Sequence, residues 1–143
     1  DLGSIGKGWA VDRAVDALRA EGVNSGLVDV GRNVYALGTP DDDSDGWRIG
    51  VLHPETGEVM HALTLRDASV ATSSNAEQSQ WLDGVKIGHL LDAHAGRPAH
   101  ARRSATVVAR TATSADTGST LAFLLGREGV ACLPEVTRVE LLS

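Results

Sequence analysis

The segment GWAVDRAVDALRAE at residues 8–21 decides how the first part of the chain folds. Its apolar residues recur every three or four positions, as Val11, Ala14 and Leu18 illustrate. This spacing is typical of a helix with one apolar face. Gly22 follows the segment, and glycine is the residue that most often ends a helix. We therefore predict an amphipathic helix over residues 8–21.

The segments that follow this helix favour β-strands. Leucine, valine and other strand-forming residues cluster in short runs at 27–30, 34–37, 47–52, 59–65, 85–91, 105–109 and 136–142. The runs 47–52 and 59–65 flank a turn, so we expect them to form an antiparallel hairpin. Between the first two runs, Gly31-Arg32-Asn33 predicts an irregular turn or a bulge.

A second helix is predicted near the end of the chain. Residues 116–125 have helical periodicity, and Gly126 follows as a stop. Residues 72–80 form a polar stretch that has no strand or helix pattern, and the segment 94–103 predicts a loop. Aromatic residues make up only 3% of the chain, so valine, leucine, isoleucine and alanine must fill the core, which suits β-strands packed against alanine-rich helices. We expect residues 1–143 to form a single domain.

The composition restricts the class of protein. A chain of 143 residues with 42% hydrophobic residues can bury one core, and it has no apolar run of membrane-spanning length. The formal net charge is -6 and the acidic run 41–45 has no basic counterpart, so we expect no nucleic-acid partner. Cys132 is the single cysteine, which excludes an internal disulfide and a multi-cysteine zinc site. Because the first residue is Asp1 and not Met, we interpret the sequence as a fragment of a longer chain or as a processed chain.

The segment before the first helix is rich in glycine. Residues 1–8 have the sequence DLGSIGKG. A glycine-rich turn before a helix offers free backbone amides beside the positive end of the helix dipole, which suits a phosphate group. The spacing differs from that of the P-loop motif, GxxxxGK[ST], and a packed turn is the alternative interpretation.

Asp116 and Thr120 are the second set of candidate site residues. They are four positions apart in a predicted helix, so both side-chain oxygens project from one face, and such oxygens suit Mg²⁺. The alternative is that Asp116 caps the helix and Thr120 packs against it. Asp116-Thr117-Gly118-Ser119 also spells the D-T-G-S of aspartic proteases, in which two aspartates activate water. That remote hypothesis requires a homodimer, because the sequence has no second D-T-G.

His89 is the third candidate. It lies between Asp83-Gly84 and Asp92, so one imidazole and two carboxylates fall near a predicted turn. An imidazole titrates near neutral pH, which suits a general base or a partner of a phosphate. A structural or merely exposed histidine is the alternative.

The order of these features along the chain resembles the ApbE family of FAD:protein FMN transferases. Family members contain DLGGIAKGYAVD, LVNLGGD, ATSG, DGxxxHIIDPRTG and ADALAT at similar intervals. The corresponding segments here are DLGSIGKGWAVD at 1–12, LVDVGRN at 27–33, ATSS at 71–74, DGVKIGHLLDAHAG at 83–96 and SADTGST at 114–120. The resemblance extends over nearly the whole chain.

This resemblance implies an antiparallel α+β fold and transfer of FMN from FAD, with Mg²⁺, to a threonine hydroxyl of an acceptor flavoprotein, releasing AMP. Breaking a diphosphate requires charge neutralisation, amides that hold the phosphates and a base for the attacking hydroxyl. By position, the resemblance implies metal ligands at the Gly6 carbonyl, Asp116 and Thr120, with His89 and Asp116 as catalytic residues. It implies FAD-binding residues at Gly3, Ser4, Lys7, Asp12, Gly31 and His89.

The sequence also departs from the family pattern. Arg32 and Asn33 stand where the family has glycine and aspartate, and Ala93, His94 and Ala95 replace its proline, arginine and threonine. These departures leave open a weakened FAD- or nucleotide-binding module or an FAD pyrophosphatase. Family members are about twice as long, so we expect the upstream half of the same protein or a partner chain to complete the site. The resemblance also implies a bacterial protein that is periplasmic or membrane-anchored.

Overall fold

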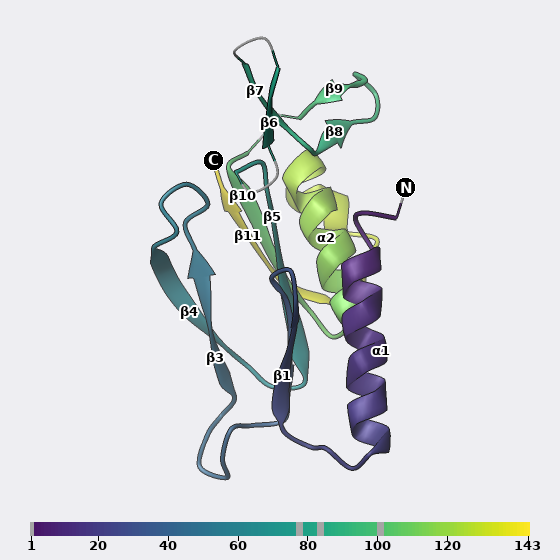
Figure 1. The fold of residues 1–143 in the computed structure, drawn as a ribbon, viewed down its shortest axis with the longest axis vertical. Coiled ribbons are helices and arrows are strands. Elements are labelled where there is room, and N and C mark those ends of the chain that lie inside the picture. Colours follow the sequence, from purple (N-terminus) through teal and green to yellow (C-terminus); the bar gives the residue numbers. More distant parts are fainter. Residues whose placement is uncertain (1, 77–78, 83–84, 100–101) are drawn as a thin grey trace.

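The computed structural model describes residues 2–76, 79–82, 85–99 and 102–143. Two helices and a β-hairpin lie on opposite faces of a central antiparallel sheet (Figure 1). The helices are α1 (Gly6–Ala20) and α2 (Ala112–Leu125), and the short 3-10 helix η1 (Gly126–Val130) continues from α2. The predicted α+β fold with a mostly antiparallel sheet is therefore confirmed.

The central sheet contains five strands in the order β1-β2-β5-β10-β11. Each neighbouring pair is antiparallel. The five strands span Gly26–Val30, Asn33–Leu37, Ala68–Ser74, Ser104–Ala109 and Val136–Leu142. Three smaller antiparallel pairs are β3 (Trp47–Leu52) with β4 (Val59–Leu65), β6 (Ser79–Leu82) with β7 (Val85–Gly88), and β8 (Leu91–Asp92) with β9 (Arg97–Pro98).

The two faces of the sheet bury different sets of side chains. Tyr35 of β2 packs in one cluster with Val11 of α1. The next residue, Ala36, packs on the other face with Val51 and Leu63 of the β3–β4 hairpin. Successive side chains of a strand point to opposite faces, so one strand contributes to both layers. The helices thus occupy one face of the sheet and the predicted β3–β4 hairpin, which is confirmed, occupies the other.

The connection between β1 and β2 is a tight two-residue turn. Val30 pairs with Asn33, and only Gly31 and Arg32 lie between them. Both have positive φ, 57° at Gly31 and 67° at Arg32, and this combination is typical of the hairpin turns that match strand twist. The predicted turn between two strands is therefore confirmed, but it is a regular hairpin turn, so the prediction that it is irregular or a bulge is wrong.

Helix α1 begins two residues before the predicted start, and α2 begins four residues before it, at Ala112. Thr111 is the N-cap of α2, and its hydroxyl accepts the amide N–H of Ser114 at 3.2 Å. Residues 112–115 are small or polar, so they add little to the apolar periodicity from which the helix was predicted. Gly126 ends α2, as predicted, with a φ of 78°.

The middle of the chain differs most from the prediction. The polar stretch at 72–80, for which no strand is predicted, includes the end of β5, where Thr72 pairs with Thr106 and Ser74 pairs with Ser104. The expected strand at 85–91 ends at Gly88. The expected loop at 94–103 contains β9. These polar strand residues are stabilised by their neighbours in the sheets, which local periodicity does not show.

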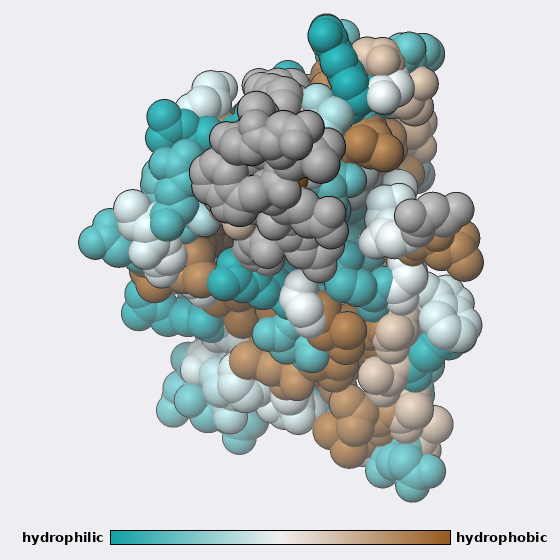
Figure 2. Space-filling view, turned by 45° about the horizontal axis from the view of Figure 1, so that its top comes forward, coloured by the Kyte–Doolittle hydropathy of each residue, from teal (hydrophilic) through white to brown (hydrophobic). Residues whose placement is uncertain are grey.

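Several large apolar side chains remain exposed in the described part of the chain. Trp9 on α1 is 59% exposed, and Leu91 and Leu125 are about equally exposed at 60% and 59%. Figure 2 shows hydrophobic residues among hydrophilic ones on the face that it presents. Among the described residues, no helix has both the length and the apolar character needed to cross a membrane.

Candidate active site between the two helices

The first turns of α1 and α2 are in direct contact. A Cβ atom at Gly8 would lie 2.4 Å from the carbonyl oxygen of Ala112 and 2.8 Å from the Cβ of Asp116. Those distances are below van der Waals contact, so glycine is required at this position. The close approach brings the backbone of α1 next to a carboxylate on α2.

That carboxylate belongs to Asp116, which is 3% exposed. Its Oδ2 accepts the amide N–H of Gly8 at 2.9 Å, and its Oδ1 lies 3.3 Å from the ammonium nitrogen of Lys7. The Lys7 side chain is 43% exposed, so the ion pair is open to solvent on one side. A buried carboxylate needs hydrogen bonds and a cation, and α1 supplies both.

Asp12 makes the matching contact in the opposite direction. Its carboxylate accepts the amide N–H of Ala112 at 2.7 Å, the amide N–H of Thr113 at 2.9 Å and the Thr113 hydroxyl at 2.5 Å. Carboxylates are favourable at a helix N-terminus because they meet unsatisfied amides and the positive end of the dipole. In this structure Asp12, a predicted FAD-binding residue, therefore holds the first turn of α2.

A group of hydroxyls lies on the sheet side of Asp116. The Thr120 hydroxyl is 3.4 Å from the Asp116 carbonyl oxygen, and the Ser119 hydroxyl donates to the same oxygen at 2.9 Å. Ser73 of β5 lies 2.7 Å from the Ser119 hydroxyl and 3.4 Å from that of Thr120. The two predicted metal ligands of α2 thus lie one helical turn apart, and the hydroxyls of Ser73 and Ser119 gather beside that of Thr120.

The glycine-rich segment lies at the start of α1, beside the same ion pair. The ammonium of Lys7 is 3.4 Å from the carbonyl oxygen of Gly3. A Cβ at Gly31, in the β1–β2 turn, would lie 3.4 Å from Cδ of Lys7. Gly6 is the first residue of α1, and both it and Ser4 are exposed. Gly3, Lys7 and Gly31, three of the predicted FAD-binding residues, therefore lie close together.

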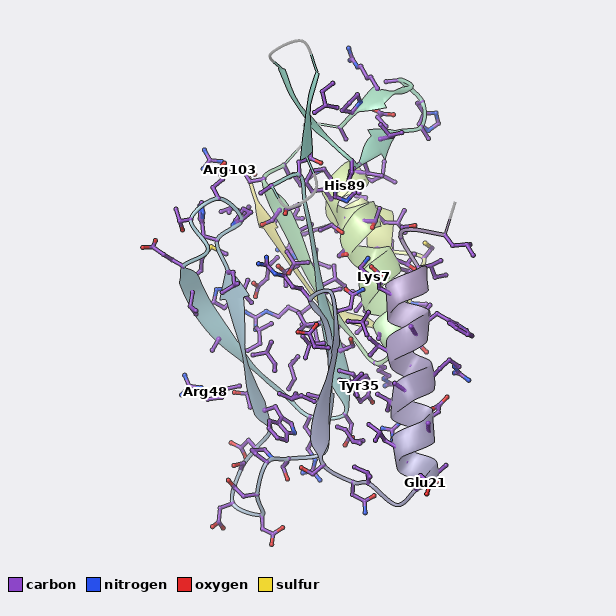
Figure 3. The ribbon with its side chains drawn as sticks, in the orientation of Figure 1. Lys7, Glu21, Tyr35, Arg48, His89 and Arg103 are labelled. Atoms are coloured by element: carbon purple, nitrogen blue, oxygen red, sulfur yellow. The ribbon has the colours of Figure 1, made fainter. Side chains whose placement is uncertain are left out.

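His89 follows β7, and its side chain is exposed. In Figure 3, His89 lies beyond the Lys7 end of α1, on the side away from Glu21.

Asp92, close to His89 in sequence, accepts the amide N–H groups of His94 at 2.9 Å and of Ala95 at 3.1 Å. The hydrogen bonds from Ala95 and His94 lower the pKa of Asp92. Asp92 therefore stabilises the β8–β9 turn, and Asp83-Gly84 lies outside the described residues.

The donor set around Asp116 fits a magnesium ion. Within the described segments, no three His, Cys, Asp or Glu side chains gather as a metal site. Mg²⁺ requires only one or two carboxylates, with hydroxyls, carbonyls, waters and substrate phosphates as its other partners. A single buried carboxylate with the Thr120 hydroxyl one turn away matches this pattern, and Lys7 is exposed enough to leave the carboxylate when the ion binds. Asp116, Thr120 and the first turn of α1 are therefore a suitable location for the ion.

Two other interpretations of Asp116 are not matched by this geometry. The D-T-G-S segment lies inside α2, whereas the protease hypothesis requires a loop that follows an apolar strand. Asp116 also does not cap α2, because Thr111 is the N-cap.

The sequence analysis did not identify Gly8 and Ser119 as site residues. Gly8 follows Lys7 in the glycine-rich segment, so the sequence could have indicated it as a site residue. Ser119 could not be found from the sequence, because its contact with Ser73 exists only in the folded chain.

Comparisons with known proteins identify the family of this chain. The model of the ApbE family matches residues 1–142. The chain is 37% identical to a FAD:protein FMN transferase of Treponema pallidum (strain Nichols), over 99% of this chain and 42% of that protein. It is 36% identical to one from Klebsiella pneumoniae (strain 342), over 93% of this chain and 41% of that protein. The chain thus spans about two fifths of the length of these curated relatives.

Solved structures show the same fold. The crystal structure of the ApbE protein of Thermotoga maritima superposes with a TM-score of 0.85 and 32% identity, over 100% of this chain and 51% of that one. The flavin transferase ApbE of Vibrio cholerae superposes with a TM-score of 0.75 and 28% identity, over 100% of this chain and 50% of that one. With the family model matched over almost its whole length, the chain belongs to the ApbE family.

Proposed function

We propose that this chain forms part of a Mg²⁺-dependent FAD:protein FMN transferase that moves FMN from FAD to a threonine hydroxyl of an acceptor flavoprotein and releases AMP. Family membership and the names of its relatives support the reaction class. The single observation on which the site rests is the buried Asp116 carboxylate, which faces Lys7 and the first turn of α1.

In this proposal the residues of the chain have separate tasks. Asp116, Thr120 and the Gly6 carbonyl hold the metal, and bound Mg²⁺ supplies positive charge that stabilises the diphosphate as its P–O bond breaks. Lys7 adds a second cation beside the same carboxylate. Gly3 and Gly31 lie against the Lys7 side chain, and Ser4 is exposed just before α1; together they contact the phosphates of FAD, where backbone without bulky side chains permits close approach of an anion.

His89 acts as the general base. It takes the proton of the threonine hydroxyl as the oxygen forms a bond to the phosphorus of the FMN part of FAD. The bond from that phosphorus to the bridging oxygen breaks, and AMP leaves with the bond electrons. The exposure of His89 is consistent with a base that must meet a residue of a second protein.

A hydrolytic reaction is the second candidate. Water and a threonine hydroxyl attack the same phosphorus, and the exposed position of His89 admits water as well as a protein. In that case the protein is an FAD pyrophosphatase that yields FMN and AMP. A catalytically weakened FAD-binding module differs from both, because it releases no AMP.

We also propose that residues beyond this chain complete the FAD site. The chain covers about two fifths of its curated relatives and half of the solved structures that it matches. Further sequence of the same protein, or a partner chain, supplies the remainder. By analogy with the family, we propose that the protein is bacterial and is either periplasmic or membrane-anchored. Cell fractionation tests this location.

The test uses the full-length protein with FAD, Mg²⁺ and a candidate acceptor. Chromatography measures AMP, and mass spectrometry measures the FMN adduct on the acceptor. We expect Asp116→Ala and His89→Ala to abolish both products, while Asp16→Ala, a change at an exposed residue of α1, retains them. AMP without an adduct would identify hydrolysis, and full activity of both site variants would overturn the assignment.

A further inference from the structure

The contact between the helices is reciprocal. Gly8 of α1 donates its amide to Asp116, and Asp12, one turn after Gly8, accepts the amide of Ala112. Ala112 in turn lies one turn before Asp116. Each helix therefore presents a carboxylate to the first turn of the other, with a four-residue spacing on both sides.

Asp12 makes the stronger half of this contact. Both of its carboxylate oxygens accept from the start of α2, and they receive three hydrogen bonds of 2.5 to 2.9 Å. The donors are two backbone amides and the Thr113 hydroxyl, so the contact restrains the backbone of α2 and not only a side chain. Charge-assisted hydrogen bonds of this kind are about twice as strong as neutral ones.

The position of Asp116 depends on this restraint. Asp116 lies one helical turn beyond the backbone that Asp12 holds, so a shift or rotation of α2 against α1 moves its carboxylate directly. Its Oδ2 is occupied by the amide of Gly8, and this leaves Oδ1 directed toward Lys7. The Asp12 contact therefore holds the backbone from which the Asp116 carboxylate projects, and the Gly8 amide orients that carboxylate.

We propose that Asp12 is a positioning residue for the metal ligand Asp116 and does not contact FAD. This inference rests on the proposed function, because it requires Asp116 to bind the metal. It reassigns Asp12, which the family resemblance implies as an FAD-binding residue. Residues that orient a metal ligand typically change metal affinity by about 10- to 100-fold when they are replaced.

Asp12→Asn in the full-length protein tests the inference. The amide keeps one acceptor oxygen, but it turns an NH₂ group toward amide donors, so part of the contact is lost. Mn²⁺ serves as the probe, and its electron paramagnetic resonance signal measures affinity without turnover. We expect Asp12→Asn to bind Mn²⁺ about 10-fold more weakly than the wild type, which is the loss typical of replacing a residue that orients a metal ligand. We expect FAD affinity in EDTA to be unchanged.

Two control variants separate positioning from other effects. Asp16→Asn removes a negative charge from the same helix at an exposed residue that pairs with Arg13, and we expect unchanged Mn²⁺ affinity. Val15→Ala makes a cavity at a buried position between α1 and the sheet. We expect Val15→Ala to lower Tm and to leave Mn²⁺ affinity within twofold of the wild type. A loss of stability alone then does not explain the weaker Mn²⁺ binding of Asp12→Asn.

The outcomes distinguish this inference from the function on which it rests. If Asp116→Asn loses Mn²⁺ affinity and Asp12→Asn does not, the metal site stands and the positioning role is wrong. Weaker FAD binding by Asp12→Asn in EDTA, with Mn²⁺ affinity retained, would show a direct FAD contact and also overturn the inference. If the wild type binds no Mn²⁺, or Asp116→Asn binds it normally, the proposed metal site fails and the inference fails with it.

Discussion

Lys7 and Asp116 form an ion pair of 3.3 Å in which the lysine is 43% exposed and the carboxylate only 4%. The two residues are 109 positions apart in the sequence, and they meet because the first turns of α1 and α2 touch at Gly8. An exposed cation beside a buried anion can exchange its partner without unfolding the core. The pair thus combines a structural contact with access for a ligand.

We expect Lys7→Met to lower the free energy of unfolding by about 1–2 kcal/mol, because Asp116 then stays buried with the Gly8 amide as its remaining described donor. Urea denaturation measures the change. The double variant Lys7→Met/Asp116→Asn removes the unpaired charge and keeps an acceptor for Gly8, so it should recover most of the loss. Equal stability of the wild type and Lys7→Met would show that the ion pair contributes nothing.

Gly8→Ala should be severely destabilising. Its Cβ would lie 2.4 Å from the carbonyl oxygen of Ala112, so the helices must separate, at a cost of about 3 kcal/mol. Gly6→Ala is the matched control, since nothing lies within 4 Å of a Cβ there and alanine favours a helix. Thermal unfolding of both variants checks this. A Gly8→Ala protein as stable as Gly6→Ala would contradict the close contact.

Local periodicity was sufficient to predict the elements that pack by one apolar face. The helix at 8–21 and the hairpin of β3 and β4 were confirmed because Val11, Val15, Val51 and Leu63 recur at the spacing of their own element. The end of β5 was missed for a physical reason. Thr72 and Ser74 are polar, but they lie in a strand between two others, and their partners in the sheet are remote in sequence.

The site shows the same limit. The chemical types and order of Lys7, Asp12, Asp116 and Thr120 predict them as site residues, and the structure places Lys7 in contact with Asp116. Their contacts were not predictable, because Gly8 and Asp116 are 108 positions apart and the helix contact that joins them leaves no local pattern. Asp12 illustrates the consequence, since its place in a motif does not reveal that its partner is a helix terminus.

Glu135 should make stability depend on pH in the acidic range. It accepts the hydroxyls of Ser114 and Thr111, both at 2.6 Å, and these hydrogen bonds lower its pKa in the folded state. The stabilisation is complete above the unfolded-state pKa of a glutamate, about 4.3, and is lost as the pH falls through the lower folded-state value. Chemical denaturation at pH 7 and at about pH 3 measures it.

The control for this prediction is Glu135→Gln, which keeps an acceptor but cannot ionise. We expect the difference in unfolding free energy between wild type and Glu135→Gln to be largest at pH 7 and to shrink toward pH 3. Exposed Glu58→Gln provides the background change for removing one carboxylate. A constant difference over this range would mean that Glu135 does not contribute through its charge.

Arg32 occupies a backbone conformation that favours glycine. Its φ is 67° in the two-residue turn between β1 and β2, and an L-residue in this region costs about 1 kcal/mol relative to glycine. Arg32→Gly should therefore raise the free energy of unfolding by about 0.5–1 kcal/mol, and Arg32→Asn by less, because asparagine tolerates the region better than arginine. Arg48→Gly, within β3 at a position paired with Thr64, should lower the free energy of unfolding, since glycine weakens a strand. Urea denaturation of the three variants checks the order, and a loss of stability in Arg32→Gly would show that side-chain contacts of Arg32 outweigh its backbone cost.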